Sequence, residues 1–391
     1  LPTKFLLMYI VTPMGPLPQK INDENELDEM VNSKNLVPYP HINYPITNET
    51  LERFLREVKF DKLTLNKQNL DSVNFNLKRM LQLNDSNIAL TQPSLISQLI
   101  CHNSTIGPSE YIRELSVLIW QNDSINWQLI KYNNLHTLDI SDTKDQFNLQ
   151  FKMPELRDVT YKGPSFKFTQ YLSGVRNLLI DCESIDFDSS NLQSLQHLSL
   201  VNCELRNLDF LRDSVQLKQL TLQNNKLARI SITNNLTQLF VQFNPIVELR
   251  CQNSIENLSL IKCKLKTISL LRCCSNVIHM NLSFNYLTSL KEISHFSQLK
   301  SINLHSNLLT IEQFRFLSQL KSLTALSYQN CSKNCFDETQ IGKLKSLKAF
   351  KHHQKVEAEP FETDLLESRK GQTGSAKHIN TATFDKFNIE F

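Results

Sequence analysis

Glycine is scarce in this chain, at 7 of 391 residues, and no GxGxxG, GxxxxGK(S/T) or GxSxG pattern occurs. Phosphate-binding loops, and the tight turn that carries the nucleophilic serine of many hydrolases, depend on those patterns. No apolar run approaches the roughly 18 residues that a membrane-spanning helix needs. The net charge is only +3, and no basic stripe with interleaved aromatic residues indicates nucleic-acid binding. The sequence therefore points away from nucleotide-dependent enzymes, serine hydrolases, membrane-spanning proteins and nucleic-acid-binding proteins.

Cysteine is present, but its pattern fits neither a disulfide framework nor a metal site. The nine cysteines are an odd number, and none forms a CxxC pair. Cys331 and Cys335, followed by His352 and His353, look like metal ligands, but no second pair completes a zinc site. The sequence thus predicts no metal and no cofactor. Free buried thiols indicate a reducing compartment, so we expect a cytoplasmic or nuclear protein.

Secretion is the less favoured alternative. Lys4 is followed by the apolar segment FLLMYIV, which is short for a signal sequence and has no small-residue cleavage site after it. Eight N-x-(S/T) triplets occur, but the chain is rich in Asn and Ser. One of them, at Asn281, falls in the centre of a predicted strand, where a glycan would fit poorly.

An aliphatic repeat runs without interruption from Leu195 to Cys331. Each copy reads LxxLxLxx(N/C), and successive copies begin roughly 20 residues apart. In the copy at 217–227, Leu220 and Leu222 alternate with Thr221, which places both leucines on one face of a short strand. We expect the Asn or Cys at the ninth position to satisfy backbone groups where the chain leaves the strand. The copies begin at Leu195, Leu217, Leu236, Ile255, Val277, Leu299 and Leu323.

This period predicts an α/β solenoid, a leucine-rich-repeat horseshoe with a concave parallel β-sheet and a mixed 3₁₀, helical and extended convex side. The two shortest copies, 217–235 and 236–254, leave room for an extended return, whereas the longer copies admit a short helical segment, most clearly at 311–320. Thr47 begins a segment that reads as an N-capped amphipathic helix covering the first strand. Weaker copies, without the Asn or Cys, begin at Phe60, Leu115, Leu135, Leu156 and Val175. A last, degenerate turn begins at Leu347.

Two resemblances follow from these patterns. The repeat resembles the intracellular leucine-rich repeats of the phosphatase-1-regulator type, whose units read LxxLxxLxLxxNxLxxL. Leu192, Leu195, Leu198, Leu200, Cys203, Leu205 and Leu208 reproduce that string, and Asn244-Pro245-Ile246 is a common variant of its turn. Separately, Leu1-Pro2 with Leu6, Leu7, Tyr9 and Ile10 resembles the opening of an F-box, the module by which substrate receptors dock on a ubiquitin-ligase core. The chain departs from the F-box pattern after Val11.

These readings divide the chain into three parts. Residues 1–46, which contain six prolines between 13 and 45, are predicted to form an N-terminal arm or an F-box-like remnant. Residues 47–350 are the leucine-rich-repeat solenoid with an N-terminal helical cap. Residues 351–391 lack the repeat and read as an acidic, polar C-terminal tail.

A binding site is expected on the concave face, at the third, fifth, seventh and eighth positions of each copy. This face is polar and amide-rich, with one apolar cluster that is typical of a protein-interaction hot spot. Phe240, at a strand centre, is the favoured anchor, whereas Phe243 and Phe284 could equally pack on neighbouring turns. The predicted partner-binding residues are Phe240, Phe243, Ile261, Phe284, Gln219, Gln238, Gln242, His279, Asn281, Asn303 and His305.

The function that this surface favours is that of a non-catalytic scaffold or adaptor binding a protein partner on the concave face. The repeat places no Ser, Cys or carboxylate beside the histidines of the sheet, and the acidic stretch at 181–188 is expected in a return segment, so we expect no enzyme. One alternative is an F-box-type substrate receptor of a ubiquitin ligase, with the ligase core as a second partner. Another is the recognition region of a larger enzyme.

Overall fold

The computed structural model describes residues 19–33, 37–74, 80–131, 133–187, 192–232, 235–251, 254–328 and 349–351. All of them belong to one compact unit, Met14–His352. The F-box-like opening, the pair Cys331 and Cys335, and the predicted tail beyond residue 351 lie outside the described residues.

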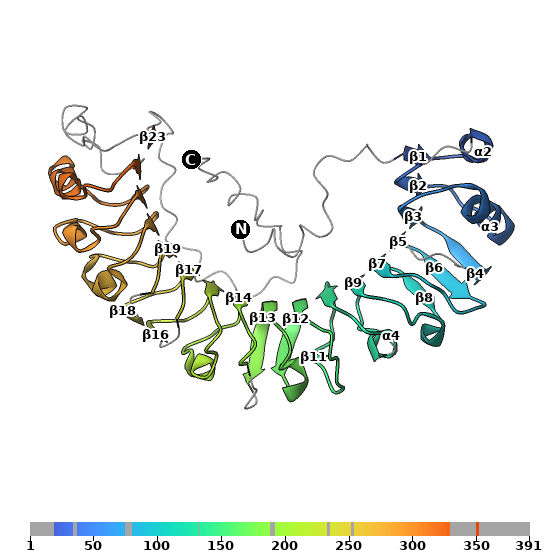
Figure 1. Cartoon of the computed structure of the whole chain (residues 1–391), viewed down its shortest axis with the longest axis horizontal. Helices are drawn as coiled ribbons and strands as arrows, with labels where there is room; N and C mark the ends of the chain where they lie inside the picture. Colours follow the sequence, from blue (N-terminus) through green and yellow to red (C-terminus); the bar gives the residue numbers. More distant parts are fainter. Residues whose placement is uncertain are drawn as a thin grey trace, which may run out of the picture. The chain divides into compact units, whose positions relative to one another are not determined.

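Short parallel strands, one from each turn, form a single sheet along this unit and line its concave side (Figure 1). Aliphatic residues occupy equivalent register positions in neighbouring strands, so that Leu220 pairs with Leu198 on one side and Leu239 on the other. The leucine-rich-repeat solenoid expected from the period is therefore confirmed. In order across the sheet the strands are β1 (Gln19–Ile21), β2 (Pro40–Ile42), β3 (Lys62–Asn66), β5 (Met80–Asn84), β7 (Gln98–His102), β9 (Val117–Gln121), β10 (Thr137–Ser141), β12 (Asp158–Phe168), β13 (Asn177–Phe187), β14 (His197–Val201), β15 (Gln219–Gln223), β17 (Gln238–Gln242), β19 (Asn257–Ile261), β20 (His279–Asn281), β21 (Ser301–Asn303), β22 (Ala325–Ser327) and β23 (Ala349–Lys351).

The convex side of the solenoid mixes strands with 3₁₀ and α-helical segments (Figure 1). The turns of 18 or 19 residues that begin with β3, β5, β15 and β17 return through a second strand. The 19-residue turns that begin with β7 and β12 contain a short 3₁₀ helix, and the 21-residue turn that begins with β10 contains a two-residue strand. The mixed convex side and the helical segment at 311–320 are thus confirmed. The return strands are β4 (Asn69–Val73), β6 (Asn87–Leu90), β8 (Thr105–Gly107), β11 (Phe147–Asn148), β16 (Arg229–Ile232) and β18 (Glu248–Cys251), and the helices are α2 (Glu24–Ser33), α3 (Asn48–Glu57), α4 (Trp127–Lys131), η1 (Ser109–Tyr111), η2 (Gln170–Leu172), η3 (Asp209–Leu211), η4 (Ser269–Cys274), η5 (Ile293–His295) and η6 (Ile311–Gln319).

The N-terminal side of the sheet reaches further than the repeat pattern indicates. Helix α3 is capped as predicted, since the Thr47 hydroxyl accepts a hydrogen bond from the Thr50 amide at 3.1 Å. It lies in the chain between β2 and β3, however, and is therefore the return of one turn. Strands β1 and β2 fall within the segment 1–46 that we assign to an N-terminal arm. Such short strands carry too little alternation to be seen in a sequence.

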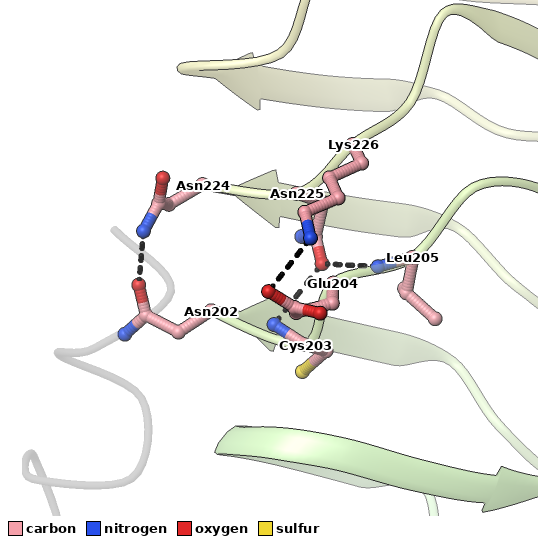
Figure 2. Close-up of polar contacts among 7 residues, drawn as sticks. All are labelled: Asn202, Cys203, Glu204, Leu205, Asn224, Asn225 and Lys226. Carbon is pink, nitrogen blue, oxygen red and sulfur yellow. Dashed lines mark hydrogen bonds and ion pairs between the residues drawn. The ribbon is translucent and has the colours of Figure 1, made fainter. Parts of the chain in front are cut away.

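The ninth position of each copy, which we call the ladder position, pairs with the backbone of neighbouring turns as predicted. The Asn225 carboxamide oxygen accepts from the amides of Cys203 and Leu205 at 3.1 and 3.2 Å (Figure 2). Its nitrogen donates to the Leu200 carbonyl at 3.0 Å. Asn285 repeats this pattern further along the solenoid, at Cys263 and Leu265. One short polar side chain therefore satisfies the buried backbone groups that two neighbouring turns leave unpaired.

The copies that begin at Phe60 and Leu135 lack Asn or Cys at the ladder position, as predicted, and Gln68 and Thr143 take it. In the turns of β5 and β7, which the repeat pattern did not identify, serine takes it. Ser86 accepts from the Gln68 amide at 3.0 Å and donates to the Asn84 carbonyl at 2.8 Å, and Ser104 accepts from the Ser86 amide at 2.9 Å. The bonded residues of these turns are 18 positions apart. The turns of β5 and β7 were not predicted, because a serine at the ladder position does not match the pattern LxxLxLxx(N/C).

The two longest strands lie in the middle of the unit. Strands β12 and β13 pair over their whole length, so the acidic stretch at 181–188, expected in a return segment, begins inside β13. Beneath them Phe166 stacks on Phe147, with ring centroids 4.6 Å apart, and both rings are fully buried. The extra strand length thus covers an aromatic core in place of the usual aliphatic one.

We expect Leu220→Ala to lower the free energy of unfolding by about 2 to 5 kcal/mol. Leu220 is fully buried and lies between Leu198 and Leu239 in register, so its truncation leaves a cavity that spans three turns. Urea unfolding followed by circular dichroism measures the change. Thr221→Ala, on the opposite face of the same strand, is the control; an equal loss in both variants would contradict the assignment of faces.

Candidate functional site

The predicted binding residues lie on strands β15 to β21 or directly after them. Phe240, Ser259, Asn281 and Asn303 are register partners and form one row across the strand centres. The row is less accessible than the sequence suggests, because its side chains pack against their neighbours in adjacent turns. Of the predicted residues, Gln219, Gln242 and Asn303 are buried, Gln238, Phe240, Ile261, His279, Asn281 and His305 are half-buried, and only Phe243 and Phe284 are exposed.

A second row follows the end of each strand, where one residue adopts a left-handed backbone. Phe243 has φ of 52° and Phe284 has φ of 57°. This conformation turns the amide toward the next turn, so that the Phe243 amide donates to the Ile261 carbonyl at 3.0 Å and the Phe284 amide to the His305 carbonyl at 2.8 Å. Asparagine tolerates this backbone, and Asn202 and Asn224 occupy the same position in earlier turns. A phenylalanine does not favour it.

Lys262 lies between the two phenylalanines and connects them. Its ammonium nitrogen is 4.9 Å from the centroid of the Phe243 ring and 5.2 Å from that of Phe284. The Phe284 ring also meets the His305 imidazole edge to face, at 4.9 Å and 78°. We call Phe243, Lys262 and Phe284 the edge row.

The exposure of the two phenylalanines, more than their backbone, indicates a functional role. The left-handed conformation is shared by the equivalent residues of other turns, among them Asn202, Asn224 and Ser306. Phe243 and Phe284 are 44% and 37% exposed, and each exposed cation–π contact contributes only about 0.5 to 1 kcal/mol. Neighbouring exposed aromatic side chains are typical of an interaction surface.

The charge of the edge row is also unsatisfied. Within the described ranges, the Lys262 ammonium has no carboxylate partner and no hydrogen-bond acceptor, only the two rings. Its three N–H donors are therefore available to a carboxylate or carbonyl oxygen. The Lys262 ammonium thus lies between two aromatic rings. Such a surface can bind a carboxylate that is flanked by apolar groups.

One prediction about the histidines is wrong. The repeat register places Ser301 directly beside His279, and the Nδ1 atom lies 2.7 Å from the serine hydroxyl. The two residues are 22 positions apart, so only the pairing of turns could reveal the contact. Burial and the nearby Lys300 lower the pKa of His279 and so favour the neutral imidazole.

Among the residues that the structure describes, no helix is long and apolar enough to cross a membrane. The seven cysteines described are all free thiols.

Comparison with known proteins gives structural matches only. No protein-family model matches the chain, and no curated protein does so. An internalin of Listeria monocytogenes is 14% identical, with a TM-score of 0.45, over 85% of this chain and 89% of its own. A leucine-rich-repeat protein of Leptospira interrogans is 16% identical, with a TM-score of 0.47, over 85% of this chain and 88% of its own. The leucine-rich-repeat ectodomain of a plant receptor kinase from Arabidopsis thaliana is 16% identical, with a TM-score of 0.42, over 80% of this chain and 44% of its own. The strand register itself establishes the leucine-rich-repeat solenoid.

Proposed function

We propose that this protein is a non-catalytic interaction scaffold or adaptor that binds a protein partner along the edge row and the adjoining concave face. The observation that carries this proposal is the pair of exposed phenylalanines, Phe243 and Phe284, held in a backbone conformation unfavourable to them. Exposed aromatic residues surrounded by half-buried polar groups are typical of interface hot spots. Phe240, the anchor favoured by the sequence, is half-buried and contributes from the centre of the face.

The partner segment that this surface suits carries a carboxylate beside apolar side chains. A carboxylate can reach the Lys262 ammonium, whose neighbours are the two rings. Apolar groups on either side can cover Phe243 and Phe284 and displace water from them. Burial of the rings then strengthens the charge interaction, because it lowers the local dielectric.

Exchange of both edge phenylalanines for asparagine separates binding from stability. Asn fits the left-handed backbone better than Phe, so Phe243→Asn with Phe284→Asn should leave the unfolding midpoint unchanged or raised. Loss of the two rings should weaken partner capture by about tenfold or more, which corresponds to at least about 1.4 kcal/mol. Affinity capture with quantitative mass spectrometry compares the wild type with the double variant.

Tyr286→Asn is the matched control, since Tyr286 is 42% exposed but follows the ladder residue Asn285 into the return segment. A protein retained by the wild type and by Tyr286→Asn but lost by the double variant supports the proposal. Identical capture by all three proteins would refute it.

The finer assignments remain proposals as well. An F-box-type substrate receptor would use the opening at Leu1-Pro2 and would co-purify with a ubiquitin-ligase core, whereas a simple scaffold would not. The recognition region of a larger enzyme would show a catalytic domain elsewhere in the reading frame. A cytoplasmic or nuclear location fits the free thiols, and imaging of the tagged protein tests it.

A further inference from the structure

Three cysteine thiols converge on the convex side of the solenoid. The sulfur of Cys251 lies 2.8 Å from that of Cys274 and 3.1 Å from that of Cys273, and the last two are 3.7 Å apart. Within the described ranges, this is the one group of three or more His, Cys, Asp or Glu side chains whose ligand atoms come together. No disulfide joins them, since all three are free thiols.

The repeat explains how residues from different turns reach one point. Cys251 ends the return strand β18, and Cys273 and Cys274 end the 3₁₀ helix η4 of the following turn. They are 22 and 23 residues apart, about one repeat, so stacking of the returns brings them together. No local CxxC motif marks these three cysteines, so they were not predicted as a site. The spacing of about one repeat between Cys251 and the other two is the signal that identifies them.

The geometry is that of a ligand set and not of a single cross-link. A disulfide joins two sulfurs at about 2.0 Å and would leave the third thiol idle. Here each sulfur is within reach of the other two, and none of the three faces a carboxylate or imidazole in the described part of the chain. Cys251 and Cys273 are half-buried and Cys274 is buried, so the group is largely shielded from solvent.

We propose that Cys251, Cys273 and Cys274 form a three-thiolate site for a soft metal cation, with Cu(I) as the ion that suits it best. Thiolates select soft cations such as Cu(I) and zinc. Structural zinc normally requires four ligands, whereas Cu(I) is satisfied by three thiolates. Three sulfurs at about 2.3 Å from one ion, as in zinc–thiolate sites, lie roughly 4 Å from one another. The Cys251 sulfur, at 2.8 Å from that of Cys274, must therefore move away by about 1 Å, which its half-buried side chain permits.

A bound cation would displace the protons of the three thiols and be held by their sulfurs. It would tie the return segments of two adjacent turns together, because Cys251 lies in one of them and Cys273 and Cys274 lie in the next.

Anaerobic titration of the reduced full-length chain with Cu(I), in competition with a chromophoric Cu(I) chelator, tests the site. We expect a single ion per chain, an ultraviolet thiolate-to-copper charge-transfer band and a raised Tm, because the ion binds only the folded state. Cys251→Ser and Cys274→Ser should each weaken binding by roughly 100-fold or more, since even loss of an outer-shell partner costs about 10- to 100-fold. Circular dichroism verifies that both variants remain folded.

Two control variants locate the ion. Cys182→Ser changes a buried thiol that donates to the Ser184 carbonyl and lies outside the three-thiol group. A double change of Cys331 and Cys335 to Ser removes the pair outside the described residues. Both variants should bind as the wild type does. Binding that survives Cys251→Ser, or that is lost with Cys331 and Cys335, would overturn the proposal. So would preference for Zn(II) over Cu(I), or an intact mass showing that two of the three thiols have lost their hydrogens to a disulfide.

Discussion

Phe166→Ala is expected to lower the free energy of unfolding by about 3 to 5 kcal/mol. The Phe166 ring is fully buried and stacks on Phe147 at an interplanar angle of 4°. It also touches Tyr161 at 5.6 Å and Phe168 at 5.1 Å between ring centroids. These rings come from β11 and β12, whose paired backbones prevent the site from collapsing on the cavity.

The consequence extends beyond one turn. A solenoid is stabilised by contacts between neighbouring turns, and a weak interface in the middle divides it into two halves. Urea unfolding should therefore show a lower midpoint and also a broader or two-step transition. Phe316→Ala, at a half-buried convex position under Arg315, is the matched control and should have a small effect. An effect of equal size at the two positions would disprove the aromatic core.

Asn285→Ala is expected to destabilise the fold by about 3 kcal/mol or more, since it leaves several buried groups unpaired at about 1 to 3 kcal/mol each. The Asn285 oxygen accepts from the Cys263 and Leu265 amides at 2.9 and 3.1 Å, and its nitrogen donates to the Leu260 carbonyl at 2.7 Å. Asn285 is 2% exposed, so water cannot replace it.

Chemical denaturation measures this loss, and Asn257→Ala provides the comparison. Asn257 lies on the half-buried face of β19, where its change should cost under about 1 kcal/mol. Amide exchange should also accelerate at Cys263 and Leu265 in the Asn285 variant. Unchanged exchange at these two amides would show that the ladder residue does not protect them.

The sequence was sufficient to predict the solenoid, because its aliphatic period depends on burial that any such coil requires. Leu220 and Leu222 alternate with Thr221, and the structure places them accordingly. Turn length also predicted the kind of return, since the short copies that begin at Leu217 and Leu236 return through strands β16 and β18, whereas longer copies have room for a 3₁₀ helix. The serines at Ser86 and Ser104 were not predicted, because the repeat pattern admits only Asn or Cys at the ladder position.

The candidate site was only partly predictable, because it depends on backbone conformation and on pairing between turns. The positions of Phe243 and Phe284 were identified, but their left-handed backbone and the intervening Lys262 required the structure. The contact between His279 and Ser301 and the thiol group at Cys251 likewise join residues one repeat apart. A sequence gives such spacings without saying which side chains turn toward each other.

The dissociation constant of the Phe243→Asn, Phe284→Asn double variant for a partner purified by means of the wild type tests the central claim most directly. Titration calorimetry gives that constant, and the unfolding midpoint of the same preparation serves as the reference. Our account predicts binding weaker by about tenfold or more with a midpoint that does not fall. Binding equal to that of the wild type, or weakened only alongside a lower midpoint, would contradict the role of the edge row.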